Sequence, residues 1–135
     1  MLTPYKYCTF LALLAFAAVP AFAADLVSVS THVTNPVANA NGTNSGDILI
    51  NNITTADVRV SLNVRVVYAN GAVQTLSGIT DPGTLAPGEG AAVFIHFVIP
   101  PDAPAGLATF IADVTATSGS LQEQESSSAS FVVIP

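Results

Sequence analysis

The chain has 135 residues, half of them hydrophobic, with 9 acidic and 3 basic side chains, one Cys and no Trp. A chain of this length is expected to form one domain. Charged residues make up only 9% of it, a composition that excludes an intrinsically disordered protein and a nucleic-acid-binding protein.

The N-terminal segment has the features of a secretory signal peptide. Met1–Phe10 contains the only Lys and is followed by the apolar run LALLAFAAVPAFA. Ala21 and Ala23 are small residues at the positions that signal peptidase requires, so cleavage is predicted after Ala23. The run is shorter than the roughly 20 residues of a spanning helix, which disfavours an uncleaved anchor. We therefore expect a signal peptide over 1–23 and a single secreted or periplasmic domain over 24–135.

Cleavage changes the composition of the exported domain. Its 112 residues contain no Cys, Met or Lys, and its 2 Arg and 9 acids give a net charge of −7. Disulfides, thiolate metal sites and a nucleophilic Cys are thereby excluded. The negative charge repels polyanions, so nucleic acid is not an expected partner. After cleavage the domain is not expected to insert into a membrane. The contacts of the domain are expected to be noncovalent.

Apolar and polar residues alternate along the exported domain, and turn-forming residues separate the alternating runs, a pattern that predicts β-strands. Seven strands are expected: Leu26–Val33, Asp47–Ile53, Val58–Val66, Ala72–Ser77, Ala91–Ile99, Leu107–Thr117 and Ala129–Ile134. The polar segments between them, Asn35–Gly46 and Ser118–Ser128, are predicted as a long loop and a turn. Asn70–Gly71 predicts a two-residue hairpin loop, and Asp81–Gly90 a crossing between sheets.

Two of these strands present candidate interaction residues. In the first strand one face carries Val27, Val29, Thr31 and Val33. The long predicted loop separates this strand from the next, so it is a candidate for exchange into a neighbouring molecule. The alternative is an ordinary first strand.

The fifth predicted strand has apolar residues on both faces. Its outer face carries Phe94, His96 and Val98, an apolar strip that is a candidate interaction surface. The second sheet would otherwise cover this strip.

Seven short strands without a helix predict an all-β, antiparallel immunoglobulin-like (Greek-key) β-sandwich. The stretch TLAPGEGAAVFIHFVIPPDAPAGLATFIADVTATSG, Thr84–Gly119, contains a Leu-Ala-Pro-Gly-Glu turn, a strand, a proline-rich turn and another strand. It resembles bacterial extracellular immunoglobulin-like domains of the cell-adhesion-related and repeat type. The resemblance implies a spacer, adhesion module or appendage, and it transfers no catalytic residues.

No pattern in the chain indicates a reaction. His32 and His96 are isolated from each other and from Cys, so neither predicts a metal site. Six acids at strand ends and turns are interpreted as turn formers, with calcium binding as the alternative: Asp47, Asp57, Asp81, Glu89, Asp102 and Asp113. No Gly-x-Ser-x-Gly motif positions a nucleophile. We expect no catalytic residues, no cofactor and no metal.

The function expected from the sequence is that of a non-enzymatic structural or adhesive protein. It would act through a protein partner or through self-association, the latter as a self-assembling extracellular subunit. Carbohydrate or surface binding is the alternative, for which Tyr68 and an outward Phe94 would supply the aromatic platform.

Overall fold

The computed structural model describes residues 25–135, so the predicted signal peptide and its cleavage site lie outside the described residues. All regular elements in this part of the chain are β-strands. They are β2 (Val27–Val33), β3 (Val37–Asn39), β4 (Thr43–Asn52), β5 (Val58–Val67), β6 (Val73–Leu76), β7 (Gly83–Leu85), β8 (Gly90–Val98), β9 (Gly106–Ser118) and β10 (Leu121–Ile134).

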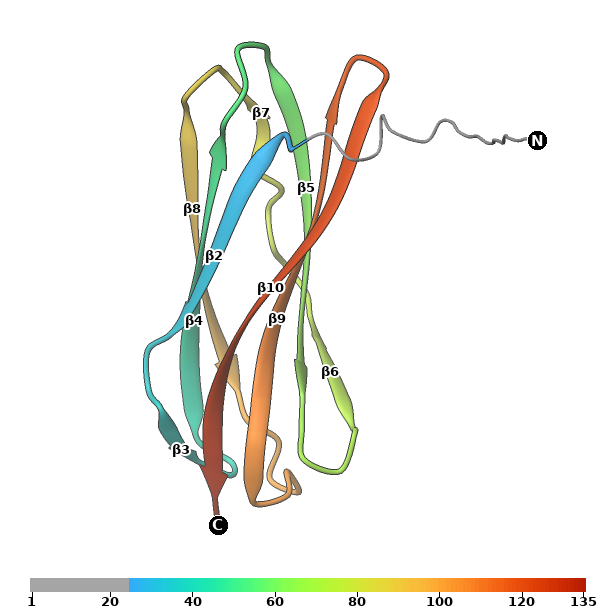
Figure 1. Cartoon of the computed structure of the whole chain (residues 1–135). Helices are drawn as coiled ribbons and strands as arrows, with labels where there is room; N and C mark the ends of the chain where they lie inside the picture. The colour runs from blue at the N-terminus through green and yellow to red at the C-terminus, as the bar shows by residue number, and fades with distance from the viewer. Residues whose placement is uncertain (1–24) are drawn as a thin grey trace, which may run out of the picture.

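The strands form two sheets that pack against each other along the length of the molecule (Figure 1). The larger sheet has the order β3-β10-β9-β5-β6, with β7 also beside β5, and the smaller sheet has the order β2-β4-β8. Every strand pair is antiparallel except β3 with β10. The all-β prediction is confirmed, and the two sheets enclose one apolar core.

The inward faces of the strands fill this core as the alternation predicted. On β5 every second residue from Val58 to Val66 is buried, and on β9 Phe110, Ala112 and Val114 are buried. The rings of Phe97 and Phe110 stack across the sheets, with their centroids 5.9 Å apart. A fully buried side chain of this size contributes roughly 1.5–3 kcal/mol to stability.

The predicted strand number was too low, because the polar segment Asn35–Gly46 is not a continuous loop. It contains β3 and the start of β4. Asn44 is only 2% exposed, and its side chain accepts the N–H of Asn35 and donates to the carbonyl of Asn35. This internal pairing lets a polar sequence enter a sheet. The other additional strand, β7, lies within the predicted crossing Asp81–Gly90, which does lead from the larger to the smaller sheet.

The prediction of a turn over Ser118–Ser128 was wrong. Residues 121–128 of this segment are the first half of β10, which pairs residue by residue with β9 from Leu121 opposite Ser118 onward. The loop between them is Gly119–Ser120, and Gly119 has the positive φ of 60° that a tight hairpin needs. Backbone pairing with a central strand outweighs the polar composition of the segment.

The hairpin predicted at Asn70–Gly71 is confirmed, but its loop has one more residue than expected. The N–H of Gly71 donates to the carbonyl of Tyr68, and the N–H of Tyr68 donates to the carbonyl of Ala72. Gly71 adopts φ 86°, so the positive-φ residue closes a three-residue loop.

Residues 25–135 contain no helix with the length and apolarity needed to span a membrane.

Candidate functional site

The predicted interaction strip lies on the outer face of β8, at the edge of the smaller sheet. Phe94 is 73% exposed and Val98 is 57% exposed, and His96 is exposed between them. Ile95 and Phe97 point inward and are buried. The structure thus places all three predicted residues on one accessible face, while their role stays a prediction.

The pairing of β8 with β4 shows which residues of β8 direct their backbone N–H and C=O groups to β4 and which direct them away from it. In an antiparallel pair, residues that bond to the partner strand alternate with residues that direct their N–H and C=O groups away from it. Just beyond the two ends of this ladder, Asn52 N–H donates to the carbonyl of Glu89, and Ile99 N–H donates to the carbonyl of Gly42. The odd-numbered residues of β8 are therefore the ones that bond to β4.

The even-numbered residues of β8 direct their backbone groups to the open edge of the sheet. These are Ala92, Phe94 and His96, together with Gly90 and Val98 at the strand ends. The carbonyl of Val98 accepts a hydrogen bond from the Nε2 of Gln74, in agreement with this direction. The backbone bonds described for residues 25–135 include none from Ala92, Phe94 or His96 to the far side of β8.

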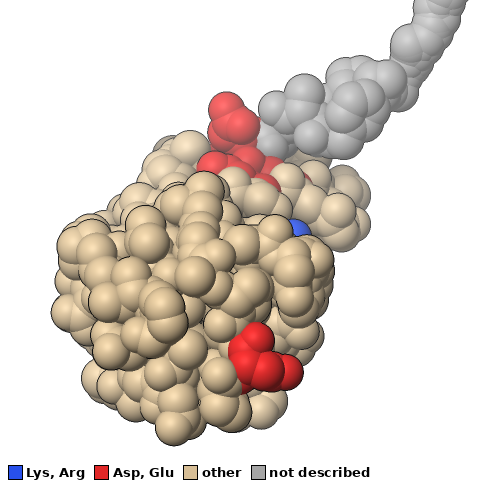
Figure 2. Space-filling view, turned by 90° about the horizontal axis from the view of Figure 1, so that it is seen from below, with Lys and Arg blue, Asp and Glu red and all other residues tan. Residues whose placement is uncertain are grey.

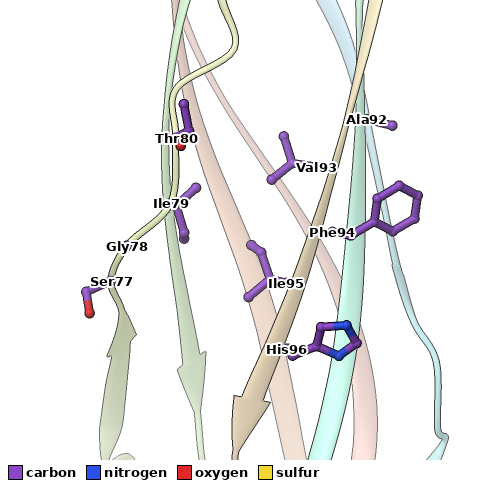
Figure 3. A pocket seen from close by; sticks show the side chains of 9 residues that line it. All are labelled: Ser77, Gly78, Ile79, Thr80, Ala92, Val93, Phe94, Ile95 and His96. Carbon is purple, nitrogen blue, oxygen red and sulfur yellow. The ribbon is translucent and has the colours of Figure 1, made fainter.

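A cleft of about 410 Å³ lies beside this edge, between β8 and the segment Ser77–Thr80. Figure 3 shows Val93 and Ile95 on the side of β8 that faces this segment, whereas Phe94 and His96 project to the other side. The segment follows β6 but does not join β8 as a strand. The cleft therefore adjoins an open strand edge.

The polar neighbours of the strip are on β4. Nδ1 of His96 and Oγ of Ser45 are 2.6 Å apart. Asp47 lies opposite Phe94, and its Oδ2 is 3.9 Å from Nδ1 of His32 on β2. The two histidines thus share a face of the smaller sheet but have separate partners, and within residues 25–135 no three His, Cys, Asp or Glu side chains are grouped as a metal site.

The candidate exchange strand lies in the chain's own smaller sheet. β2 pairs with β4 along its whole length, from Val27 opposite Asn52 to Val33 opposite Gly46. Of the predicted face, Val27 and Val33 are buried, while Val29 and Thr31 are partly buried. Exchange of this strand between molecules stays a prediction.

A contact between β2 and β10 was missed by the sequence analysis. Oε1 of Glu123 accepts the N–H groups of Leu26 at 2.7 Å and of Val27 at 3.1 Å, and further along Thr31 and Ser127 share a hydroxyl hydrogen bond. Glu125 is between Glu123 and Ser127 on the same half-buried face of β10. Every residue of 122–128 is polar, so no alternation in the sequence marks the inward face of this segment.

The pKa of Glu125 is raised from 4.5 to about 7. Burial is the largest cause, followed by the hydrogen bond to Glu123, the negative charge of Glu123 and that of Asp25. These causes favour the neutral acid. The junction between β2 and β10 is therefore sensitive to protonation.

The other predicted acids have local partners or lie apart. Asp113 binds Arg65, with Nη1 of Arg65 2.7 Å from Oδ2 of Asp113. Asp81 accepts the N–H of Leu62, and Glu89 accepts the N–H of Ala86. Glu89 thus acts as a turn former, as expected. Asp47 and Asp113 lie inside β4 and β9, so the interpretation of these two acids as turn formers was wrong.

The charges are distributed unevenly along the molecule. Figure 2, which views the molecule from its lower end in Figure 1, shows a surface with few charged side chains. The segments 34–46, 66–73, 98–108 and 129–135 carry Asp102 and no other charged residue. Asp25, Asp57, Glu89 and Glu123 belong to the strand ends and turns of the opposite end. The approach of another molecule is therefore least opposed at the lower end and along β8, which has no charged residue.

No known family model matches the sequence, and no curated protein resembles it closely enough to count as a match. Known structures with a similar fold do exist. The alkylpurine DNA glycosylase AlkC of Pseudomonas fluorescens has a TM-score of 0.60 and 15% identity, with 82% of this chain and 31% of the glycosylase aligned. A family 123 glycoside hydrolase from Clostridium perfringens has a TM-score of 0.54 and 15% identity, with 80% and 27% aligned.

A CARDB domain from Pyrococcus furiosus, solved with two metal ions, has a TM-score of 0.50 and 17% identity. The alignment covers 80% of this chain and 87% of that domain. The chain thus spans about the whole CARDB domain but less than a third of the two enzymes. At these identities the comparisons establish a fold, an immunoglobulin-like β-sandwich, and they establish no activity.

Proposed function

We propose that this chain is an exported, non-enzymatic structural or adhesive protein that acts through noncovalent protein contacts. The observation that carries the proposal is the edge of the smaller sheet at β8. It combines an uncharged strand of nine residues with outward Phe94 and Val98 that are 73% and 57% exposed. Exposed apolar residues beside unpaired backbone groups are the features with which sheet edges bind other chains.

The finer fold assignment belongs to this proposal. We assign the sandwich to the Greek-key immunoglobulin-like class and to the bacterial extracellular, cell-adhesion-related type. Support comes from the crossing of the chain between sheets, since β4 and β8 lie in the smaller sheet and β5 and β9 in the larger one. Further support is the near-complete alignment with a CARDB domain.

The assignment as a non-enzymatic, exported protein rests on residue chemistry. The side chains of Asp81, Glu89 and Asp113 are engaged in local hydrogen bonds, which leaves them in structural roles. The N-terminal sequence supports export, and the domain from residue 24 onward has no Cys that an oxidising compartment could link.

Carbohydrate binding is the second candidate function, favoured by the outer face of the larger sheet. A hollow of about 450 Å³ lies there, lined by polar residues that include Asn63, Asp113, Thr115 and Gln124. Such side chains hydrogen-bond to sugar hydroxyls. Tyr68, the aromatic residue expected to stack on a sugar, is only 4% exposed, so Phe94 is the remaining aromatic candidate and lies on the other sheet.

A surface-binding assay separates the two functions. Beads coated with the purified protein would be incubated with cells of the source, treated beforehand with protease or with periodate. We expect protease to abolish binding and periodate to leave it unchanged, because the proposed contacts are with protein. Periodate-sensitive binding, or saturable binding to one sugar on a glycan array, would replace the proposal with carbohydrate recognition.

A further inference from the structure

We propose that the partner of the β8 edge is a second copy of this chain, whose β8 pairs antiparallel with the first. The two smaller sheets would then form one continuous sheet of six strands. This inference rests on the proposed function, because it specifies which protein contact the edge makes.

The other edges of the sheets are less suited to pairing. β3 and β7 have three residues each and β6 has four, so they offer little backbone to another strand. β2 has seven residues, but the carboxylate of Glu123 on β10 binds the N–H groups at its start. Short or covered edges resist association, whereas a long uncharged edge without Pro invites it. The first half of β10 is not covered by β3 either, but it contains Glu123 and Glu125. β8 is therefore the edge of the described chain that is both long and uncharged.

The sequence of β8 is compatible with pairing to itself. In the register that overlaps all nine residues from Gly90 to Val98, the two-fold axis passes through Phe94. Each Phe94 then faces the Phe94 of the second copy, and Ala92 faces His96. All of these residues direct their backbone groups to the open edge, so every pair exchanges two hydrogen bonds and the three central pairs give about six.

The side chains in this register are also compatible. β8 contains no Asp, Glu, Lys or Arg, so no like charges meet across the axis, although the whole chain has a net charge of −6. The paired Phe94 rings would bury surface that is now 73% exposed. On the inner side Val93 of one copy faces Ile95 of the other, next to the cleft bordered by Ile79. An apolar second copy thus fits the edge better than a charged peptide.

Site-specific disulfide formation tests both the partner and the register. In a Cys8→Ser background, where an introduced Cys is the only thiol, Phe94→Cys places two thiols across the axis. The Cα atoms of such a pair are about 5.5 Å apart, within the range of a disulfide. We expect rapid formation of a covalent dimer with mild oxidant. Val98→Cys, on the same exposed face, is the matched control and should remain monomeric, because its two copies would lie about 27 Å apart.

Sedimentation without cross-linking is the second measurement. We expect the wild-type protein to dimerise as its concentration rises, Phe94→Lys to weaken the dimer at least tenfold, and Ser30→Lys on the exposed face of β2 to leave it unchanged. A wild type that stays monomeric, or equal cross-linking by Phe94→Cys and Val98→Cys, would overturn the inference. The surface-binding assay is independent of both results, so failure here would leave the proposed adhesive function standing with another partner.

Discussion

At the scale of single residues, Gly46 illustrates how tightly the two sheets are packed. A Cβ atom added at this position would lie 2.5 Å from the ring of Phe110, which is completely buried. A contact this short forces the ring or the backbone to move. We expect Gly46→Ala to reduce the free energy of unfolding by about 1–3 kcal/mol, measured by denaturant or thermal unfolding.

A double-mutant cycle identifies the cause of this effect. Phe110→Leu removes the ring atoms that oppose the new methyl group, so Gly46→Ala should cost less in the Phe110→Leu background than in the wild type. Equal costs in the two backgrounds would mean that Phe110 is not the obstacle.

At the scale of elements, the junction between β2 and β10 makes a prediction about pH. Glu125 has a pKa of about 7 in the folded protein against an ordinary value of 4.5. The folded state therefore binds a proton at Glu125 more tightly than the unfolded state does. The resulting contribution to stability is fully present at a pH below the unfolded-state pKa of 4.5, and it is lost as the pH rises through the folded-state pKa of about 7. We expect the thermal midpoint of the wild type to fall between about pH 5 and pH 8.

Glu125→Gln should flatten this decline, because an amide does not ionise. Asp102→Asn, at an exposed turn away from the junction, is the control and should retain the wild-type slope. The assignment to Glu125 would be refuted by a Gln variant whose midpoint declines as steeply as that of the wild type.

The same elements show how far the sequence alone determines this fold. In β5 the apolar residues from Val58 to Val66 alternate without interruption, so strand, face and burial could all be predicted. In β10 the first half contains Glu123 and Glu125 on its inner face, and its strand structure depends on pairing with β9 and on contact with β2. These partners are distant in the sequence and leave no local signal.

The candidate site was predictable only in part for a related reason. Alternation identified Phe94, His96 and Val98 as outward residues, and the structure places them there. That β8 lies at a sheet edge, with Ser77–Thr80 beside it, depends on strand order. Strand order follows from packing of the whole chain, which alternation within one strand does not encode.

At the scale of the whole molecule, an excess of acids surrounds an uncharged edge. The domain from residue 24 onward has 9 acids and 2 Arg, and one of the two, Arg65, is paired with Asp113. Two copies therefore repel each other at long range, while their proposed contact at β8 contains no ionised carboxylate. The same excess opposes the compact state of each copy.

Added salt should consequently strengthen both folding and association. Raising NaCl from low ionic strength to about 0.15 M shortens the screening length to about 8 Å, which weakens repulsion between separated carboxylates and leaves an apolar edge contact intact. We expect a higher thermal midpoint and a lower dissociation constant of the dimer, measured by calorimetry and sedimentation at constant pH. Phe94→Lys tests whether the two effects separate, because this variant should keep the salt-dependent gain in stability but lose the dimer. Weaker association of the wild type at higher salt would instead mean that ion pairs, rather than the uncharged β8 strand, hold the copies together.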